Sequence, residues 1–130
     1  MKGGSPHARG GAALAVFSGA ADLAWLKILK PGFRHCFVVV DCNGIWVVHN
    51  PLSHYTEITV LDGVSRRDLA AWYRQRGFRV VACRVQTPPR RSAPVGFYTC
   101  VEAVKRILGI HARRVITPWN LYNFLISCRI

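Results

Sequence analysis

The chain has 130 residues, 51% of them hydrophobic, which is enough for one globular domain and too apolar for a disordered segment. No stretch approaches the roughly 20 consecutive apolar residues of a transmembrane helix, so we do not expect a membrane span. Eighteen basic residues against six acidic ones give a net charge of +12, and twelve of the eighteen lie between Arg66 and Arg114. This excess favours an anionic partner, either a cell-wall polymer or lipid surface, with nucleic acid as the alternative.

The cysteines indicate where the protein acts. There are five of them, an odd number with no Cys-x-x-Cys pair, which argues against a disulfide framework and for a reducing compartment. The apolar run Ala12–Phe17 follows basic residues, as in a secretory signal, but it is short and rich in alanine. We therefore expect a cytoplasmic or virion-associated protein and do not expect secretion.

The first half of the chain predicts a leader, a helix and three strands. Residues 1–11 are rich in glycine and predict a flexible leader ahead of a single domain, 12–130. A helix is expected at Leu23–Leu29, closed by Pro31 and Gly32. The Asn43-Gly44 pair is a strong signal for a two-residue hairpin turn. The expected strands are 33–40, 45–49 and 55–61.

The second half predicts helices around one more strand. Ser65 and Asp68 have the spacing of an N-terminal cap, and Thr117-Pro118 has the composition of another helix start. The resulting elements are a helix at 66–76, a strand at 78–85, a loop at 87–94, a helix at 100–108 and a last helix from Thr117-Pro118. Together they predict an α+β domain with a small antiparallel sheet packed against helices.

The helix that begins at Cys100 has a clear signal at each end. Thr99 and Glu102 have the spacing of a capping box, and Gly109 is the expected left-handed stop. An apolar stripe on it predicts the buried face, and three charged residues are expected to face solvent. The stripe is Val101, Val104, Ile107 and Leu108, and the charged residues are Glu102, Lys105 and Arg106.

Cys100 is the candidate nucleophile. At the first position of a helix, backbone N–H groups lack intrahelical partners and the helix dipole is positive, so a thiolate is favoured over a thiol. The thiolate is the form that attacks an acyl carbon. A proton-transfer partner is then required, and His35, at the mouth of the first predicted strand, is the candidate general base.

A third residue is expected to orient the His35 ring, and the hairpin register decides which one. If the turn has two residues, paired numbers sum to 87 and Asn50 shares the face of His35. If it has three, the sum is 86 and His49 takes that place. Turn chemistry favours Asn50, and both residues remain candidates.

The order of these residues resembles a known superfamily. His35, a hairpin partner, and then Tyr-Thr-Cys-Val-Glu-Ala-Val-Lys-Arg-Ile-Leu-Gly-Ile (98–110) resemble the circularly permuted branch of the NlpC-type, papain-like cysteine hydrolases, which includes lecithin:retinol acyltransferase. In that branch the histidine precedes the cysteine, and the cysteine begins a core helix. The segment 116–122 is similar to small phage and prophage proteins of this kind.

The resemblance implies a permuted papain-like fold with Cys100 as nucleophile, His35 as base and the hairpin residue as orienter. Members hydrolyse peptidoglycan peptides, cleave other amides or transfer acyl groups, so a peptidase, amidase or acyltransferase is expected. The acyltransferase has a second histidine in the orienting role, at a spacing slightly different from that of His35 and His49. We assign substrate binding to Arg90, Arg91 and Tyr98, which precede the nucleophile.

Two other interpretations compete with the hydrolase. Zinc ligation by Cys36, Cys42, His49 and His54 is disfavoured because the five residues between the cysteines exceed the usual spacing of a structural site. We expect no metal and no cofactor. The stronger alternative is a non-catalytic basic protein that binds nucleic acid or packs in a virion, which explains the charge directly but has no further motif in its favour.

Overall fold

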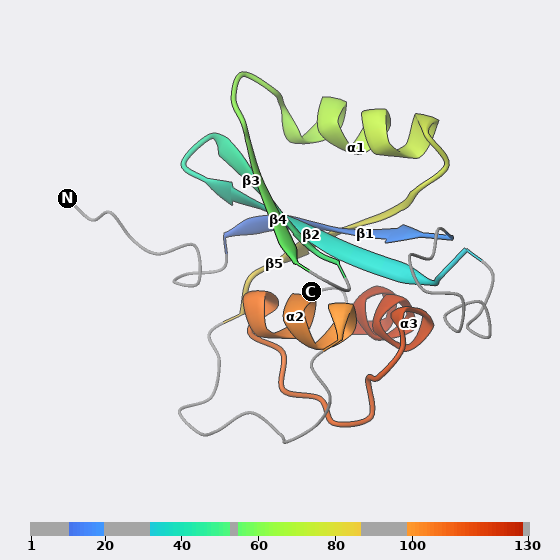
Figure 1. The fold of residues 1–130 in the computed structure, drawn as a ribbon. Coiled ribbons are helices and arrows are strands. Elements are labelled where there is room, and N and C mark those ends of the chain that lie inside the picture. Colours follow the sequence, from blue (N-terminus) through green and yellow to red (C-terminus); the bar gives the residue numbers. More distant parts are fainter. Residues whose placement is uncertain (1–10, 20–31, 53–54, 87–98, 129–130) are drawn as a thin grey trace.

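The structure is a computed structural model that describes residues 11–19, 32–52, 55–86 and 99–128. Within these ranges the chain forms an α+β fold, a five-stranded antiparallel sheet in the order β4-β3-β2-β1-β5 with three helices. Helix α1 covers one face of the sheet, and α2 and α3 cover the other (Figure 1). The strands are β1 (Ala12–Ser18), β2 (His35–Cys42), β3 (Ile45–Pro51), β4 (Thr56–Leu61) and β5 (Arg79–Arg84), and the helices are α1 (Arg66–Gln75), α2 (Cys100–Leu108) and α3 (Pro118–Cys128).

Strand β1 was missed by the sequence prediction, which read Ala12–Phe17 as a short signal-like run. It lies between β2 and β5, so both of its edges are paired and both of its faces are covered. A strand buried on both faces has no polar alternation, and its sequence is therefore a continuous apolar run. Alanine has a low strand propensity, but here the small side chains suit a position between two helical layers.

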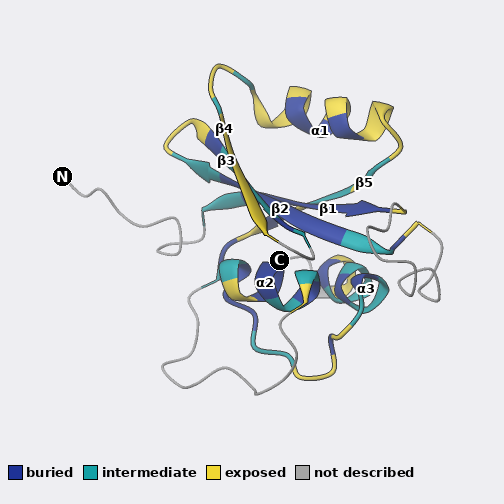
Figure 2. Ribbon diagram, in the orientation of Figure 1, coloured by how far each residue is buried: buried dark blue, intermediate teal, exposed yellow. Residues whose placement is uncertain are grey.

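Each face of the sheet has its own hydrophobic core, and buried residues concentrate along β1 and β2 (Figure 2). The α1 face is built on Leu14 and Val16 of β1 with Phe37 and Val39 of β2, packed against Tyr73. The opposite face is built on the alternate residues of the same strands and packs against α2 and α3. Its fully buried members include Phe17, Cys36, Val38, Val101, Val104, Leu108, Leu121 and Leu125.

The β2–β3 hairpin has the two-residue turn that its sequence favoured. Asn43 and Gly44 both have positive φ, at 57° and 88°, as this turn requires. Cys42 pairs with Ile45, and Val38 pairs with His49. The paired numbers thus sum to 87, which is the register that places Asn50, and not His49, on the face of His35.

Helix α2 has the predicted ends, but Lys105, one of the three residues predicted to face solvent, is buried. The Thr99 hydroxyl accepts a hydrogen bond from the Glu102 N–H, and Gly109 closes the helix at φ 76°. The Lys105 ammonium donates to the carbonyls of Ala112 at 2.6 Å and Val115 at 2.9 Å and lies 3.4 Å from a Glu102 carboxylate oxygen. These acceptors supply the partners that a buried charge requires, so the side chain joins α2 to the segment that follows it.

Some predicted elements fall on residues that the structure does not describe. These are most of the leader, the helix at Leu23–Leu29 and the loop at 87–94. Among the described helices, none is long and apolar enough to span a membrane.

The end of α2 yields a stability prediction. A β-carbon on Gly109 would lie 2.1 Å from the Gln86 carbonyl oxygen, whereas one on Gly77, which follows α1 at φ 89°, would meet nothing within 4 Å. We expect Gly77→Ala to lower the free energy of unfolding by about 1 kcal/mol, the cost of left-handed backbone at a residue with a side chain. Gly109→Ala should cost at least about 3 kcal/mol, because steric overlap adds to that strain. Urea denaturation of both variants measures the difference, and equal losses would contradict the packing at Gly109.

Candidate functional site

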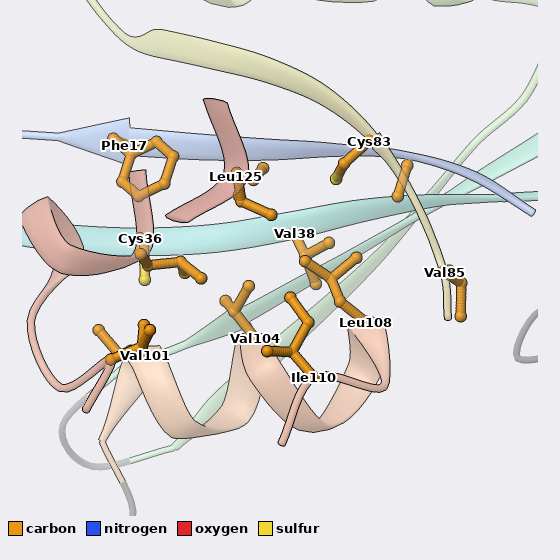
Figure 3. Close-up of a cluster of buried hydrophobic side chains, with 14 of the residues drawn as sticks. Phe17, Cys36, Val38, Cys83, Val85, Val101, Val104, Leu108, Ile110 and Leu125 are labelled. Atoms are coloured by element: carbon orange, nitrogen blue, oxygen red, sulfur yellow. The ribbon is translucent and has the colours of Figure 1, made fainter. Parts of the chain in front are cut away.

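Cys100 is the first residue of α2 and contacts Cys36, the second residue of β2. The Cys36 side chain points from β2 toward this helix (Figure 3). Its sulfur lies 3.7 Å from the sulfur of Cys100, in the geometry of a hydrogen bond donated by the Cys36 thiol. Cys36 is fully buried, whereas Cys100 is only partly buried. The site therefore has one fully enclosed thiol and one cysteine that is only partly enclosed.

His35 connects the cysteine to β3 and β4. Its Nε2 lies 2.7 Å from Oδ1 of Asn50, and the Asn50 amide nitrogen donates to a carboxylate oxygen of Glu57 at 3.3 Å. Asn50 and Glu57 are directly paired across β3 and β4. Because Glu57 occupies the amide nitrogen, the amide oxygen is the atom that faces His35, and an oxygen acceptor requires a proton on Nε2. This leaves Nδ1 of His35 for Cys100, with which the imidazole also forms a side-chain hydrogen bond.

The surroundings of Cys100 lower its pKa to about 5. The largest cause is the hydrogen bond donated by the Cys36 thiol, which burial opposes. The hydrogen bond and the positive charge of His35 lower the pKa further, and the Cys36 backbone N–H adds to them. Burial raises the pKa of Cys36 well above its usual value, so that side chain stays a thiol and keeps the proton that it donates. At neutral pH the pair is thus a thiolate beside a thiol.

An aromatic cluster holds the chain just before His35. The Phe33 ring lies 4.8 Å from Trp119 and 4.9 Å from Tyr122 between centroids, so α3 packs directly on this segment. Phe33 also contacts Phe17 of β1 at 5.8 Å. Such packing fixes the entry into β2 and with it the place of the His35 ring. It gives a structural role to the segment that precedes and begins α3.

The two candidates for the orienting residue lie on opposite faces of β3. Asn50 contacts His35, whereas His49 pairs with Val38 and faces the other way. Burial lowers the pKa of His49. The structure therefore brings Asn50, and not His49, to the His35 ring. The predicted substrate-binding residues Arg90, Arg91 and Tyr98 lie outside the described residues.

Two residues of the site were not singled out from the sequence. Cys36 was considered only as a metal ligand, although its neighbour His35 was a candidate base. Glu57 had no signal, because its position opposite Asn50 depends on the register between β3 and β4. For Cys36 the hairpin alternation was a usable signal, since it places that side chain with Val38 and Val40 on the face that α2 covers.

Within the described residues, no three His, Cys, Asp or Glu side chains lie close enough together to hold a metal ion. An apolar cavity of about 620 Å³ lies on the α1 side of the sheet and reaches Asn50 and Glu57. Its walls include the four aromatic side chains Phe37, Trp72, Tyr73 and Phe78.

The described basic residues are spread over several surfaces. Arg66, Arg67, Arg74 and Arg76 are exposed on or next to α1, across the sheet from α2. The exposed pair 113–114 follows the C-terminal end of α2, whereas Cys100 begins that helix. Their nearness to Cys100 in sequence therefore does not place them around it in space.

Comparison of the chain with family models, curated proteins and solved structures finds no match. The function is therefore argued from the geometry of these side chains.

The Cys100 environment predicts how its alkylation depends on pH. Because only the thiolate reacts, labelling by iodoacetamide should rise with pH through a midpoint of about 5 and be level near pH 7. Cys36→Ala removes the hydrogen-bond donor that lowers the pKa of Cys100 most, so the midpoint of Cys100 labelling should move to higher pH. Cys42→Ala, at the far end of β2, should leave it unchanged.

The measurement is peptide mass spectrometry after timed labelling of the folded protein. Cys83 is an internal control, because burial raises its pKa to about 12 and it should stay unlabelled. A Cys100 midpoint near the unperturbed cysteine value of about 8.5 would contradict the assigned environment.

Proposed function

We propose that the chain is a cysteine hydrolase of the circularly permuted, NlpC-type papain-like kind, with Cys100 as nucleophile, His35 as its acid–base partner and Asn50 as the orienting residue. The observation that carries the proposal is the contact of one imidazole with both a thiolate and an amide oxygen. The order of histidine, amide and cysteine along the chain, with the cysteine at a helix start, supports the permuted arrangement.

The reaction begins with a thiolate that is already formed. The Cys100 sulfur attacks an acyl carbon, and the carbonyl electron pair moves onto oxygen. The N–H groups of Cys100 and Val101 have no acceptor within the helix, so they are available to stabilise that oxyanion. The protonated His35 then gives its proton to the leaving amine or alcohol, the carbon–nitrogen or carbon–oxygen bond breaks, and a thioester remains on Cys100.

The second half regenerates the enzyme. Neutral His35 takes a proton from water, the hydroxide attacks the thioester, and the carboxylic acid leaves as the thiolate re-forms. Asn50 keeps the ring in place through both halves, because its amide oxygen accepts only from Nε2 and leaves Nδ1 to exchange protons. Glu57 holds the amide in that orientation. The substrate class that we propose is a peptide or amide, with peptidoglycan stem peptides as the leading candidate.

Acylation by a reactive ester tests the site without knowledge of the natural substrate. With p-nitrophenyl acetate we expect a burst of one nitrophenol per chain and an acetyl group on Cys100. Cys100→Ala should abolish the burst, and His35→Ala should slow turnover by about 10² to 10⁴.

The matched pair Asn50→Ala and His49→Ala tests the third residue. We expect Asn50→Ala to lower turnover about tenfold or more through loss of ring orientation, and His49→Ala to change it little, because His49 faces away. Release of free amines from purified peptidoglycan, measured for the same variants, tests the substrate class. Equal losses for both substitutions would contradict the assigned role of Asn50, and a folded protein without a burst would contradict the hydrolase.

A second function, binding of a polyanion without catalysis, is favoured by one observation, the net charge of +12 with exposed arginines on both sides of the sheet. In the hydrolase proposal the same charge attracts an anionic cell wall or lipid surface toward the enzyme. Both forms of binding weaken as salt screens exposed charge over a Debye length of about 8 Å at physiological ionic strength.

Binding to peptidoglycan fragments, anionic lipid vesicles and duplex DNA across a salt series separates the two functions. We expect salt-sensitive binding to the cell-wall or lipid samples together with a reactive Cys100. Tight, salt-sensitive DNA binding by a protein whose Cys100 does not react with the ester would support the nucleic-acid or virion function instead.

A further inference from the structure

In hydrolysis by Cys100 and His35, the second cysteine of the site donates a hydrogen bond to the nucleophile but forms and breaks no covalent bond. The sulfur of Cys36 lies 3.7 Å from that of Cys100 and makes no step of the hydrolytic reaction. We propose that Cys36 is a resolving cysteine: a hydroperoxide oxidises Cys100, and Cys36 then captures the product as a reversible intramolecular disulfide. This needs the Cys100 thiolate but not the hydrolase activity, so it stands or fails separately.

The chemistry has two balanced steps. The Cys100 thiolate attacks the peroxide, the O–O bond breaks, Cys100 becomes a sulfenic acid and hydroxide or alkoxide leaves. The Cys36 sulfur then attacks the sulfenic sulfur, the S–O bond breaks, and the thiol proton leaves with the hydroxyl as water. One peroxide is reduced by two electrons, and two thiols are oxidised to one disulfide.

The geometry favours this pairing. A disulfide has an S–S length of about 2.05 Å, so the two sulfurs must approach by roughly 1.7 Å from their present separation. Cys100 is at the first turn of α2, where its side chain is not enclosed on all sides, and Cys36 already directs its thiol toward it. Reduced Cys100 is the reactive member because its neighbours stabilise the thiolate.

The other described cysteines are poorly placed to compete. Cys42 is six residues along β2 from Cys36, or roughly 20 Å at the usual strand rise. Cys83 is buried in β5, opposite Ala13 of β1. A disulfide between Cys36 and Cys100 also removes the thiolate from His35, so the same oxidation that protects the sulfur stops any acyl transfer until a thiol reductant restores it.

The test is oxidation of the intact protein with at least two equivalents of hydrogen peroxide, the amount that a sulfinic acid requires, followed by alkylation of the remaining thiols and tryptic mass spectrometry. The wild-type chain should lose about 2 Da and join the peptide 35–66 to the peptide 92–105. Fragmentation within 35–66 distinguishes Cys36 from Cys42. Dithiothreitol should return both the original mass and full iodoacetamide labelling of Cys100.

Two variants isolate the role of Cys36. Cys36→Ser retains a hydroxyl donor but forms no disulfide, so Cys100 should progress to the sulfinic acid, a gain of about 32 Da that dithiothreitol does not reverse. Cys42→Ser is the matched control on the same strand and should behave as the wild type. Circular dichroism of each variant before oxidation establishes that it is folded.

Three results would overturn the proposal. One is a disulfide from Cys100 to Cys42, Cys83, Cys128 or a second chain. Another is sulfinic acid on Cys100 in the wild type at the same yield as in Cys36→Ser. The third is wild-type Cys100 that does not react with peroxide while it still reacts with iodoacetamide. If Cys36→Ser does not fold, the identity of the wild-type cross-link alone decides the question.

Discussion

The site depends on the packing of the α2 N-terminus against the first residues of β2. This contact places the Cys100 sulfur 3.7 Å from the Cys36 sulfur and within a hydrogen bond of His35, both of which favour the thiolate. A buried thiolate costs solvation free energy, and burial does oppose the shift at Cys100, so the donors must outweigh it for the pKa to fall to about 5.

The rest of the fold maintains that contact. The buried face of α2, with Val101, Val104 and Leu108, packs on the sheet, and Gly109 allows the chain to turn closely past Gln86. Lys105 then ties the following segment to the helix through two carbonyls. In the same core the rings of α3 pack on Phe33, so one hydrophobic cluster anchors both the strand and the helix that carry the two reactive side chains.

The two halves of the site come from different faces of one sheet. Cys36 and Val38 both point toward α2, whereas Phe37 points toward α1. The alternation of side chains along β2 places His35 on the same face as Phe37. His35 contacts both sides because it is the first residue of β2, at the end of the sheet. A histidine two residues further along the strand would be enclosed in the α1 core. The position at the strand start is therefore what allows one ring to contact both Asn50 on β3 and Cys100 on α2.

The sequence by itself determined what depends on neighbours along the chain. Thr99 and Glu102 predicted the start of α2, and Gly109 predicted its end. Asn43-Gly44 predicted the hairpin turn whose register places Asn50, and not His49, on the face of His35. Capping and tight turns require particular residues at fixed short spacings, so they are readable locally. Tertiary structure alone decided the rest. Ala12–Ser18 is a strand because β2 and β5 pair with both of its edges. Lys105 is buried because the carbonyls of Ala112 and Val115 accept hydrogen bonds from its ammonium. Cys36 contacts Cys100, which lies 64 positions further along the sequence. Such contacts follow from how whole elements pack, and no short segment of the sequence contains them.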